Sequence, residues 1–346
     1  MKFGIIGSGS WGTALAKILT DNGQHIYWWN RSEEAIEEFK LRAHNPHYLS
    51  SAKFDTSKLS LTADISKVIS SADIILIAVP SAFIEDLLCA LPKDIFSGKK
   101  ILSAIKGILP KENVLLNDFL SSYFDLPIED YFAVLGPCHA EEVAAEKLSY
   151  LTFAGKDEEM TSKIAGYFNT PYLISIVNKD IIGVQYAAIL KNIYALGAGI
   201  AHGLDYGDNF LSVFIANSAN EMAVFLRKAG IVNAEVGFTE NKENFIANDV
   251  HNNYAASVYL GDLLVTCYSL YSRNRTFGTM IGKGYSVKAA QLEMSMVAEG
   301  YNASKCMNII NQKYNAEIPI AETIFKILWQ NLSAKKGFKN IEENLV

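Results

Sequence analysis

The chain of 346 residues lacks the features that mark secreted, metal-binding or nucleic-acid-binding proteins. Its four cysteines, Cys89, Cys138, Cys267 and Cys306, are scattered, with no CxxC pair and no His and Cys spacing typical of a metal site. A formal charge of −6 leaves no cationic excess for binding nucleic acid. We therefore expect reduced thiols, no metal, no nucleic-acid partner and a cytoplasmic location.

Long apolar runs are also scarce. The chain enters a strand-like run at Lys2 rather than a charged region followed by a long apolar one, so we expect no signal peptide. The longest apolar segment, Val184–Leu204, is interrupted by Lys191, Asn192 and three glycines, and no cationic cluster flanks it. It predicts a buried core helix rather than a stable membrane insertion. With 50% hydrophobic and 20% charged residues, the sequence is typical of a soluble protein of two domains.

The first half of the sequence alternates short apolar runs with helical segments. Predicted strands are Lys2–Ile6, His25–Trp29, Ile74–Val79, Ile101–Ile105, Tyr131–Leu135, Tyr150–Ala154 and Leu173–Val177. Continuous apolar strands separated by helices predict an α/β protein with a Rossmann-type doubly wound parallel sheet, covered on both faces. Such a sheet binds its ligand beyond the carboxyl ends of the strands.

A glycine-rich turn, Gly7-Ser8-Gly9-Ser10-Trp11-Gly12, follows the first predicted strand and precedes a predicted helix over Thr13–Asp21. The GxGxxG spacing in this context predicts a dinucleotide site. Gly7 allows the tight turn, Gly9 lets the backbone approach a pyrophosphate, and Gly12 lets helix and strand pack closely. The amino end of the helix then offers free N–H groups to the phosphates.

The second predicted strand ends in Asn30-Arg31, followed by a predicted helix over Ser32–Ala43 with Ser32 as N-cap. NAD-binding proteins usually carry an acidic residue here, which binds the ribose 2′-hydroxyl. Arg31 instead suits a 2′-phosphate, because its guanidinium forms paired bonds with phosphate oxygens. The sequence therefore favours NADPH and leaves NADH open. Alternatively, Arg31 is a solvated surface residue.

Two further strand ends carry residues suited to a ligand. Lys106, beside Gly107, places a cation where the ligand crevice is expected, although it could equally be a surface lysine before a turn. The segment Gly136–Glu142 (GPCHAEE) follows the next strand and opens a helix with acids in its first turn. Both sites lie at the edge where a doubly wound sheet binds its ligand.

After Val177 the sequence predicts helices only. They are Asp180–Gly203, Asn209–Ala229, Ala255–Ser272, Val287–Glu299, Tyr301–Tyr314 and Ile320–Gln330. We expect a dinucleotide-binding domain over residues 1–178 and an all-helical C-terminal domain over 179–346. The polar segment Asn233–Tyr254 predicts an exposed loop or short surface helix, and the lysine-rich tail from Asn331 a solvated end.

Lys191 lies in the middle of an almost wholly apolar helix, followed by Asn192. A buried ammonium is costly unless it is paired or hydrogen-bonded, so the position predicts either a catalytic lysine or one that snorkels to the edge of the core. A second polar segment runs through Asp262 to Ser272-Arg273-Asn274-Arg275. Paired arginines suit a phosphate, whereas the alternative is a basic turn at the end of a helix.

Taken together, the motifs resemble those of the bacterial NAD(P)-dependent glycerol-3-phosphate dehydrogenases, over nearly the whole chain. The motifs are GSGSWGTALA (7–16), VPS (79–81), Lys106-Gly107, GPCHAEEVA (136–144), DIIGVQYAAILKNIYALGAGIAHGLDYGDN (180–209), GDLLVTC (261–267), SRNRTFG (272–278) and VAEG (297–300). Several separate motifs in the same order are more specific than one glycine-rich turn.

The resemblance implies hydride transfer between NADPH or NADH and dihydroxyacetone phosphate, which gives sn-glycerol 3-phosphate for phospholipid synthesis, in a cytoplasmic homodimer. It makes Lys191 the catalytic proton donor and acceptor. Substrate-binding positions are Lys106, Gly136, Cys138, Lys191, Asp262, Ser272, Arg273 and Asn274. Cofactor-binding positions are Gly7, Gly9, Ser10, Trp11, Gly12, Arg31, Tyr48, Lys106, Ala140, Arg273, Val297 and Glu299.

Two departures and two rival functions remain. The family usually has serine at the positions of Leu135 and Cys138, and a compact glycine-rich turn where this chain has Asn233–Tyr254. One rival is a dehydrogenase of 3-hydroxy acids or a ketopantoate-type reductase, which also uses a lysine on a helix. The other is a dinucleotide-binding sensor without turnover. The cluster Ser272–Arg275 favours a phosphate substrate.

Overall fold

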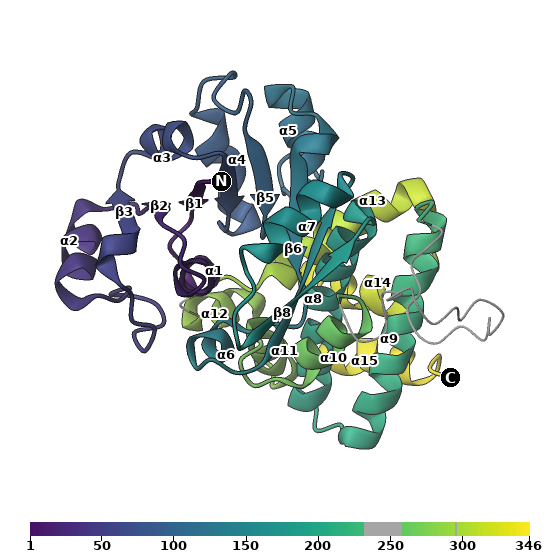
Figure 1. Cartoon of the computed structure of the whole chain (residues 1–346). Coiled ribbons are helices and arrows are strands. Elements are labelled where there is room, and N and C mark those ends of the chain that lie inside the picture. The colour runs from purple at the N-terminus through teal and green to yellow at the C-terminus, as the bar shows by residue number, and fades with distance from the viewer. Residues whose placement is uncertain (232–257, 295) are drawn as a thin grey trace, which may run out of the picture. The chain divides into compact units, whose positions relative to one another are not determined.

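The computed structural model describes residues 1–231, 258–294 and 296–346, and the chain forms two compact units. The sheet unit comprises Met1–Ile105 and Val114–Ile181, and the helical unit comprises Lys106–Asn113 and Ile182–Val346 (Figure 1). The short segment Lys106–Asn113 thus belongs to the helical unit, although sheet-unit residues flank it on both sides. The predicted domain division at residue 178 remains a prediction.

The sheet unit is built on an eight-stranded sheet in the order β3-β2-β1-β4-β5-β6-β7-β8. Its strands are β1 (Phe3–Ile6), β2 (Ile26–Trp29), β3 (Leu59–Thr62), β4 (Ile74–Ile77), β5 (Lys100–Ser103), β6 (Tyr131–Leu135), β7 (Ser149–Gly155) and β8 (Leu173–Asn178). The strand order reverses between β1 and β4, as a doubly wound sheet requires. This confirms the predicted α/β class and places the glycine-rich turn at the reversal.

Helices connect these strands. They are α1 (Ser10–Asp21), α2 (Glu33–Arg42), α3 (Ile65–Ser71), α4 (Ser81–Cys89), α5 (Leu116–Phe124), α6 (Ala140–Ala144) and α7 (Glu158–Gly166), with single turns at Thr56–Lys58 and Ile128–Asp130. The Ser32 hydroxyl accepts a hydrogen bond from Ala35 N at 3.1 Å, which confirms Ser32 as the N-cap of α2. Such a cap satisfies one of the free N–H groups at a helix start.

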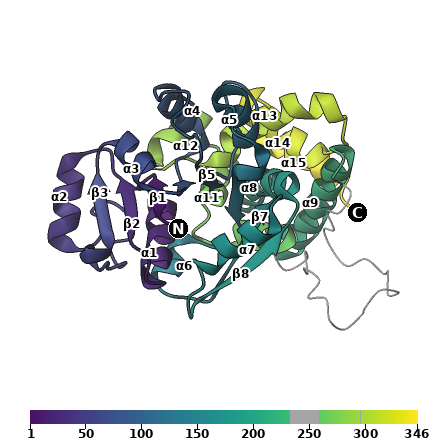
Figure 2. The same cartoon turned by 45° about the horizontal axis from the view of Figure 1, so that its top comes forward.

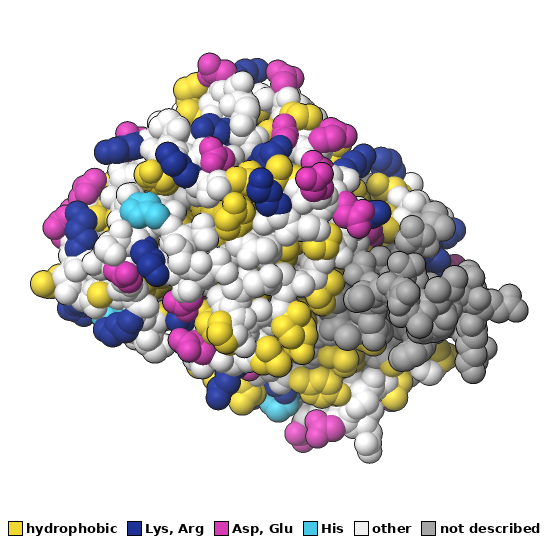
Figure 3. Space-filling view, in the orientation of Figure 1, with side chains coloured by type: hydrophobic (Ala, Val, Ile, Leu, Met, Phe, Trp, Pro, Cys, Tyr) yellow, Lys and Arg dark blue, Asp and Glu magenta, His cyan; other side chains and the backbone are white. Residues whose placement is uncertain are grey.

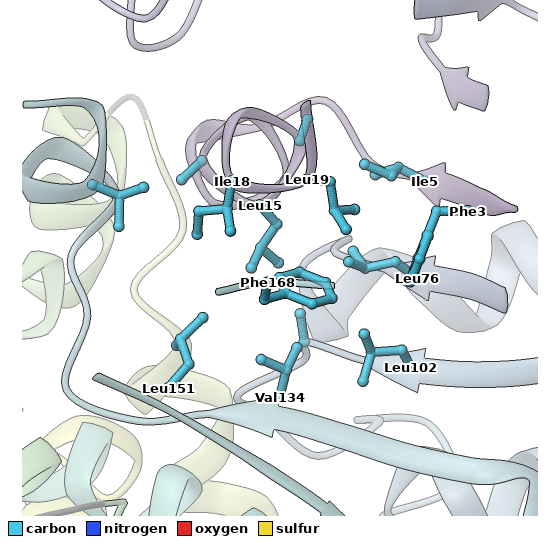
Figure 4. Close-up of a cluster of buried hydrophobic side chains, with 14 of the residues drawn as sticks. Phe3, Ile5, Leu15, Ile18, Leu19, Leu76, Leu102, Val134, Leu151 and Phe168 are labelled. Carbon is cyan, nitrogen blue, oxygen red and sulfur yellow. The ribbon is translucent and has the colours of Figure 1, made fainter. Parts of the chain in front are cut away.

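One face of α1 packs on the core of the sheet unit. Figure 4 shows Leu15 and Leu19 pointing towards Phe168, among side chains from several strands. These side chains are fully buried, which stabilises each by roughly 1.5–3 kcal/mol relative to exposure. The packing fixes the amino end of α1, and with it the glycine-rich turn.

Two features of the sheet differ from the prediction. β7 runs antiparallel to β6, and β8 runs parallel to β7, so the sheet is mixed rather than fully parallel. Continuous apolar runs favour a parallel sheet overall, but they do not fix the direction of an individual strand. β3 was not predicted, because its sequence LSLT is short and half polar and its residues are only half-buried.

The helical unit is built around α8 (Ile181–Gly203). The other helices among the described residues of this unit are α9 (Asp208–Lys228), α10 (Leu260–Tyr268), α11 (Arg273–Gly282), α12 (Val287–Glu293), α13 (Glu299–Tyr314), α14 (Pro319–Trp329) and α15 (Ala334–Glu342) (Figures 1 and 2). α8 is long and apolar enough to cross a membrane, but 94% of its most apolar window is buried inside the protein. A helix that is apolar on all sides and buried by other helices is typical of a core helix.

α8 and α11 approach each other so closely that their backbones touch. A Cβ added to Gly199 of α8 would lie 2.1 Å from the Arg275 carbonyl oxygen, and one added to Gly278 of α11 would lie 2.0 Å from the Leu196 carbonyl oxygen. Only glycine fits at these positions without a backbone shift. The contact fixes the residues at the amino end of α11 relative to Lys191.

Two predictions for the helical half require correction. The predicted helix Val287–Glu299 ends at Glu293, and the next helix starts at Glu299. The lysine-rich tail contains α15, whose Phe338 and Ile341 are buried, so it is not simply a solvated end. Its lysines lie on the exposed side of an amphipathic helix. The polar segment 233–254 lies outside the described residues.

Charged side chains of both signs are interspersed on the face of the protein shown in Figure 3. Helix α2 carries local ion pairs, Lys40 with Glu37 at 2.8 Å and Arg42 with Glu38 at 3.0 Å. Exposed pairs of this kind contribute little to stability, about 0.3–0.5 kcal/mol each. Within each pair the two charges offset one another.

Candidate active site

The glycine-rich turn joins the carboxyl end of β1 to the start of α1. Gly7 has a φ of +123°, and a Cβ there would lie 2.4 Å from the Ala78 carbonyl oxygen, just beyond β4. Gly12 packs against the Gly7 carbonyl, since its added Cβ would lie 2.3 Å from that oxygen. Gly9 differs, because a Cβ there would meet no heavy atom within 4 Å. The open space beside Gly9 is where a pyrophosphate could approach the backbone, so the turn fits a dinucleotide.

The residues after β2 are arranged for a ligand at the same edge. The Asn30 N–H donates to the Thr62 carbonyl at 3.1 Å, which holds the end of β2 beside the end of β3. Arg31 follows with an exposed side chain and makes no ion pair with any residue that the structure describes. Its guanidinium is therefore available to an external anion.

The remaining sites predicted in the sheet unit lie on its strand ends and helix starts. Ser10 and Trp11 form the first turn of α1, and Ala140 forms the first residue of α6. Gly136 has a φ of +133°, and Cys138 is buried, with 6% of its surface exposed. A thiol is a weaker hydrogen-bond partner than the serine hydroxyl common in the resembling family.

In the helical unit, Lys191 is buried and paired. Its Nζ donates to the Asp262 carboxylate and, at 3.1 Å, to the Thr266 hydroxyl. The Thr266 hydroxyl in turn donates to the Asp262 backbone carbonyl at 2.5 Å. Asp262 and Thr266 lie four residues apart and thus on the same face of α10. An ammonium group has three N–H donors, so Lys191 retains one for another partner.

The surroundings of Lys191 shift its proton affinity. Burial lowers its pKa, Asp262 opposes this, and the positive charge of Lys106 lowers it, so that together they bring the pKa of Lys191 to about 8. A lysine in this range exchanges protons near neutral pH, as an acid or base catalyst must. The other carboxylate oxygen of Asp262, Oδ2, is buried and accepts no hydrogen bond from the residues described. It can accept a hydroxyl from outside the protein.

A chain of amides links the segment of Lys106 to α8, α11 and α13. Gly300 N donates to Asn274 Oδ1, Asn274 Nδ2 donates to Asn192 Oδ1, and Asn192 Nδ2 donates to the Lys106 carbonyl, each at 2.9 Å. Buried amides in such a network hold their neighbours in one arrangement. Lys106 and Lys191 are thereby kept close enough for the charge of one to act on the other.

The amino end of α11 carries the predicted phosphate residues. Ser272 is its N-cap and accepts from Arg275 N at 3.3 Å. Arg273 is half-buried and pairs with no acidic group in the described part of the chain. Arg275 instead donates from Nη1 to the Tyr268 carbonyl at 2.7 Å, at the end of α10. A free arginine at a helix amino end is an arrangement that binds phosphate.

Hydrogen bonds in the helical unit thus link Lys191 to Asp262, and Lys106 and Asn274 to Asn192. The substrate-binding roles that the resemblance gives to Lys106, Lys191, Asp262 and Asn274 remain predictions. Val297 and Glu299 lie in the same unit at the start of α13. Two residues of the network, Asn192 and Thr266, were not among the predicted site residues. The four-residue spacing from Asp262 to Thr266 could have identified the threonine, whereas nothing local identifies Asn192 as a bridge between elements.

The fold and these residues define a class: a dinucleotide-binding α/β protein with a helical unit that carries a buried lysine–carboxylate pair. Sequence models of NAD-dependent glycerol-3-phosphate dehydrogenases match both halves, the N-terminal one over residues 2–161 and the C-terminal one over residues 180–339. The chain belongs to the NAD-dependent glycerol-3-phosphate dehydrogenase family.

Relatives agree over the whole length. The chain is 30% identical to glycerol-3-phosphate dehydrogenase [NAD(P)+] of Staphylococcus aureus (strain JH9), covering 99% of this chain and 98% of that protein. A crystal structure of glycerol-3-phosphate dehydrogenase from Coxiella burnetii has a TM-score of 0.85 at 26% identity, covering 99% of each chain. That from Plasmodium falciparum has a TM-score of 0.82 at 23% identity, covering 100% of this chain and 96% of the other, and shows the shared fold.

Proposed function

We propose that this protein interconverts dihydroxyacetone phosphate and sn-glycerol 3-phosphate, with NADPH or NADH. The main observation behind this proposal is the buried Lys191, which is held by Asp262 and Thr266 and retains one N–H donor. A glycine-rich turn fitted for a dinucleotide and a free arginine at the start of α11 support it. Membership of the family adds the substrate class.

In the reduction direction, Lys191 acts as the acid. When bound, the reduced nicotinamide supplies a hydride to the ketone carbon of the substrate. The third N–H of Lys191 then donates a proton to the developing alkoxide, and the same group accepts it in the reverse direction. A pKa of about 8 lets both protonation states exist near neutral pH.

Asp262 has two tasks in this mechanism. Its Oδ1 holds the Lys191 ammonium in place, and its free Oδ2 accepts the hydroxyl of the substrate. Thr266 fixes the direction of the Lys191 Nζ from the other side. Positioning by groups that are already in place lowers the entropic part of the barrier.

The phosphate of the substrate is bound by Arg273, with Ser272 and Asn274 at the same helix start. Binding energy from this remote group positions the ketone for reaction. Lys106 supplies a second cation, which the Asn192 bond to its carbonyl holds in place. Gly136 and Cys138 are further substrate-binding residues in this proposal.

The cofactor is bound by Gly7, Gly9, Gly12 and the first turn of α1, with further contacts from Tyr48, Ala140, Val297 and Glu299. Arg31 favours NADPH over NADH, because it offers a guanidinium to a 2′-phosphate. We further propose a cytoplasmic homodimer that supplies phospholipid synthesis.

The direct test is oxidation of NADPH and NADH, followed by absorbance, with dihydroxyacetone phosphate as the substrate. We expect turnover with both cofactors and greater efficiency with NADPH. A panel of 3-keto acids and ketopantoate, at fixed NADPH, addresses the rival dehydrogenases. Turnover of a keto acid without turnover of dihydroxyacetone phosphate would overturn the proposal, as would binding of NADPH without oxidation by any ketone.

The role of Lys191 is tested by Lys191→Met, with the exposed Lys288→Met in the same unit as its matched control. We expect Lys191→Met to lower kcat by about 10³-fold, since acid–base catalysis contributes 10²–10⁴-fold. Binding of NADPH and the folded circular-dichroism spectrum should survive. Turnover close to that of the control would remove Lys191 from the mechanism.

A further inference from the structure

Asn45, which follows α2, joins two segments that the proposed cofactor site uses. Its side chain is buried, with 2% of its surface exposed. Nδ2 donates to the Ser8 carbonyl at 2.9 Å and to the Thr13 hydroxyl at 2.7 Å. Oδ1 accepts from His47 N at 3.0 Å and Tyr48 N at 3.2 Å. An amide has two donors and two acceptor sites, so every bond that Asn45 can form is in use.

The bond to Ser8 fixes the direction of a backbone N–H in the glycine-rich turn. In a trans peptide the carbonyl and the following N–H point in opposite directions. Because the Ser8 carbonyl points at Asn45, the Gly9 N–H points away from it. Trp28 fixes the Ser8 N–H in the same way, because its Nε1 donates to the preceding carbonyl, that of Gly7, at 2.9 Å. The directions of two successive N–H groups, those of Ser8 and Gly9, are therefore fixed. Successive backbone N–H groups form the kind of concavity that binds anions.

The loop that carries Asn45 is held in place independently. Phe54 N donates to the Ala43 carbonyl at 2.9 Å, and the Phe54 ring packs 5.7 Å from Trp28 and 5.3 Å from Phe39 between ring centroids. Phe54 is 6% exposed and belongs to the core of the sheet unit. A tie that served only to anchor the loop would duplicate this packing. The specific contribution of Asn45 is the geometry of Ser8, Thr13 and Tyr48.

We infer that Asn45 is a positioning residue for the dinucleotide: it holds the Gly9 N–H ready for the pyrophosphate and sets the backbone of Tyr48 beside it. The inference rests on the proposed function, because it concerns the cofactor of that reaction. It assigns to Asn45 an effect on cofactor affinity and none on the proton transfer at Lys191.

The test compares Asn45→Ala and Thr13→Val with the wild type, using NADPH fluorescence to measure the Kd in the absence of substrate. Thr13→Val removes one of the two groups that accept a hydrogen bond from Asn45 Nδ2, and it keeps the shape of the Thr13 side chain. We expect the Kd to rise about tenfold in Asn45→Ala and about threefold in Thr13→Val, since one lost buried hydrogen bond changes an equilibrium by that order. At saturating NADPH, kcat and the KM for dihydroxyacetone phosphate should stay within about twofold of the wild type.

The matched control is Asn311→Ala. Asn311 is also a buried asparagine, which donates to the Ala316 carbonyl at 2.9 Å and accepts from its N–H at 3.0 Å. We expect this control to lower Tm without changing the Kd for NADPH. A Tm loss in Asn45→Ala with an unchanged Kd would overturn the inference, because Asn45 would then be only structural. A wild-type protein that binds neither NADPH nor NADH would overturn the proposed function instead.

Discussion

The proposed binding residues of the two units are of different kinds. The sheet unit uses backbone: glycines that allow close approach, and N–H groups at the start of α1. The helical unit uses buried side chains, with Lys191 and Asp262 each less than 5% exposed. Backbone sites depend on local sequence, whereas buried ion pairs depend on residues that are distant in the chain. Lys191 and Asp262 are separated by 71 residues.

The difference has an energetic consequence. Removing one partner of a buried ion pair leaves an uncompensated charge and costs about 3–5 kcal/mol. Removing a contact to a bound phosphate exposes no buried charge in the free protein. We therefore expect changes in the helical unit to affect rate and stability together, and changes in the sheet unit to affect cofactor affinity.

After Lys191, the largest effect is expected for Asp262. Asp262→Ala leaves the Lys191 ammonium buried and unpaired, so both Tm and kcat should fall, kcat by about 10²-fold or more. Asp262→Asn keeps the shape and removes the charge that raises the pKa of Lys191. The pKa should then fall below about 8, so the loss of ketone reduction with rising pH should begin at lower pH. Profiles of kcat from pH 6 to 9 measure this shift.

Asp208→Asn is the control, since Asp208 is an exposed acidic residue on α9. Its profile should match that of the wild type. An Asp262→Asn profile that keeps the wild-type midpoint would show that Asp262 does not set the proton affinity of the catalytic group.

The next prediction compares the same substitution, glycine to alanine, at one position in each unit. Gly278→Ala places a Cβ 2.0 Å from the Leu196 carbonyl oxygen, which forces α8 and α11 apart and should cost about 1–3 kcal/mol. Gly9→Ala meets no protein atom within 4 Å, so Tm should be almost unchanged. Its added methyl group instead occupies the pyrophosphate space and should weaken NADPH binding. Thermal melts and NADPH titrations of both variants test the contrast, and equal melting losses would contradict it.

The same contrast explains what could be predicted from sequence. The glycine-rich turn, the Ser32 cap and the strands of the first half depend on neighbours in the chain, and these predictions were confirmed. β3 was missed because Leu59–Thr62 is only half apolar. The reversal at β7 was missed because strand direction depends on packing between elements rather than on a local pattern.

In the helical unit, the residue types were visible but their connections were not. Lys191 could be identified because a lone lysine in an apolar helix needs a partner. The partner could not be derived from spacing, and Asp262 was named through the family resemblance. The cluster Ser272–Arg275 left a phosphate site and a basic turn equally open, whereas the structure has Ser272 as the N-cap of α11. The bridge of Asn192 to Asn274 joins residues 82 apart in the chain.

A smaller effect is expected for Arg31. Arg31→Ala removes an exposed guanidinium with no described ion pair, so stability should not change. The KM for NADPH should rise about tenfold. A hydrogen bond to a charged group contributes about 1.5–3 kcal/mol, and solvent screening at an exposed position reduces that contribution. The KM for NADH should stay within about twofold. Equal changes for both cofactors would contradict a 2′-phosphate role and leave Arg31 a surface residue.

The last comparison concerns a buried titratable group outside the proposed site. Glu221 on α9 accepts hydrogen bonds from Ile320 N at 2.6 Å and Ala321 N at 3.2 Å, at the start of α14. Burial raises its pKa from 4.5 to about 7, although these bonds favour the charged form. The folded protein therefore holds this proton more tightly than the unfolded chain, and Glu221 makes stability fall as pH rises from about 4.5 to 7.

Glu221→Gln removes that pH dependence and keeps one acceptor oxygen for the start of α14. Relative to the wild type, the variant should gain on the order of 1–3 kcal/mol in unfolding free energy between pH 5 and pH 8. Urea unfolding at the two pH values measures the gain, and Glu293→Gln, an exposed residue of the same unit, should show none. A gain confined to Glu221 would mean that the helical unit tolerates an incompletely compensated buried charge even away from Lys191. A difference that does not vary with pH would mean that the two backbone N–H groups compensate the charge fully, and that Lys191 and Asp262 are the exception.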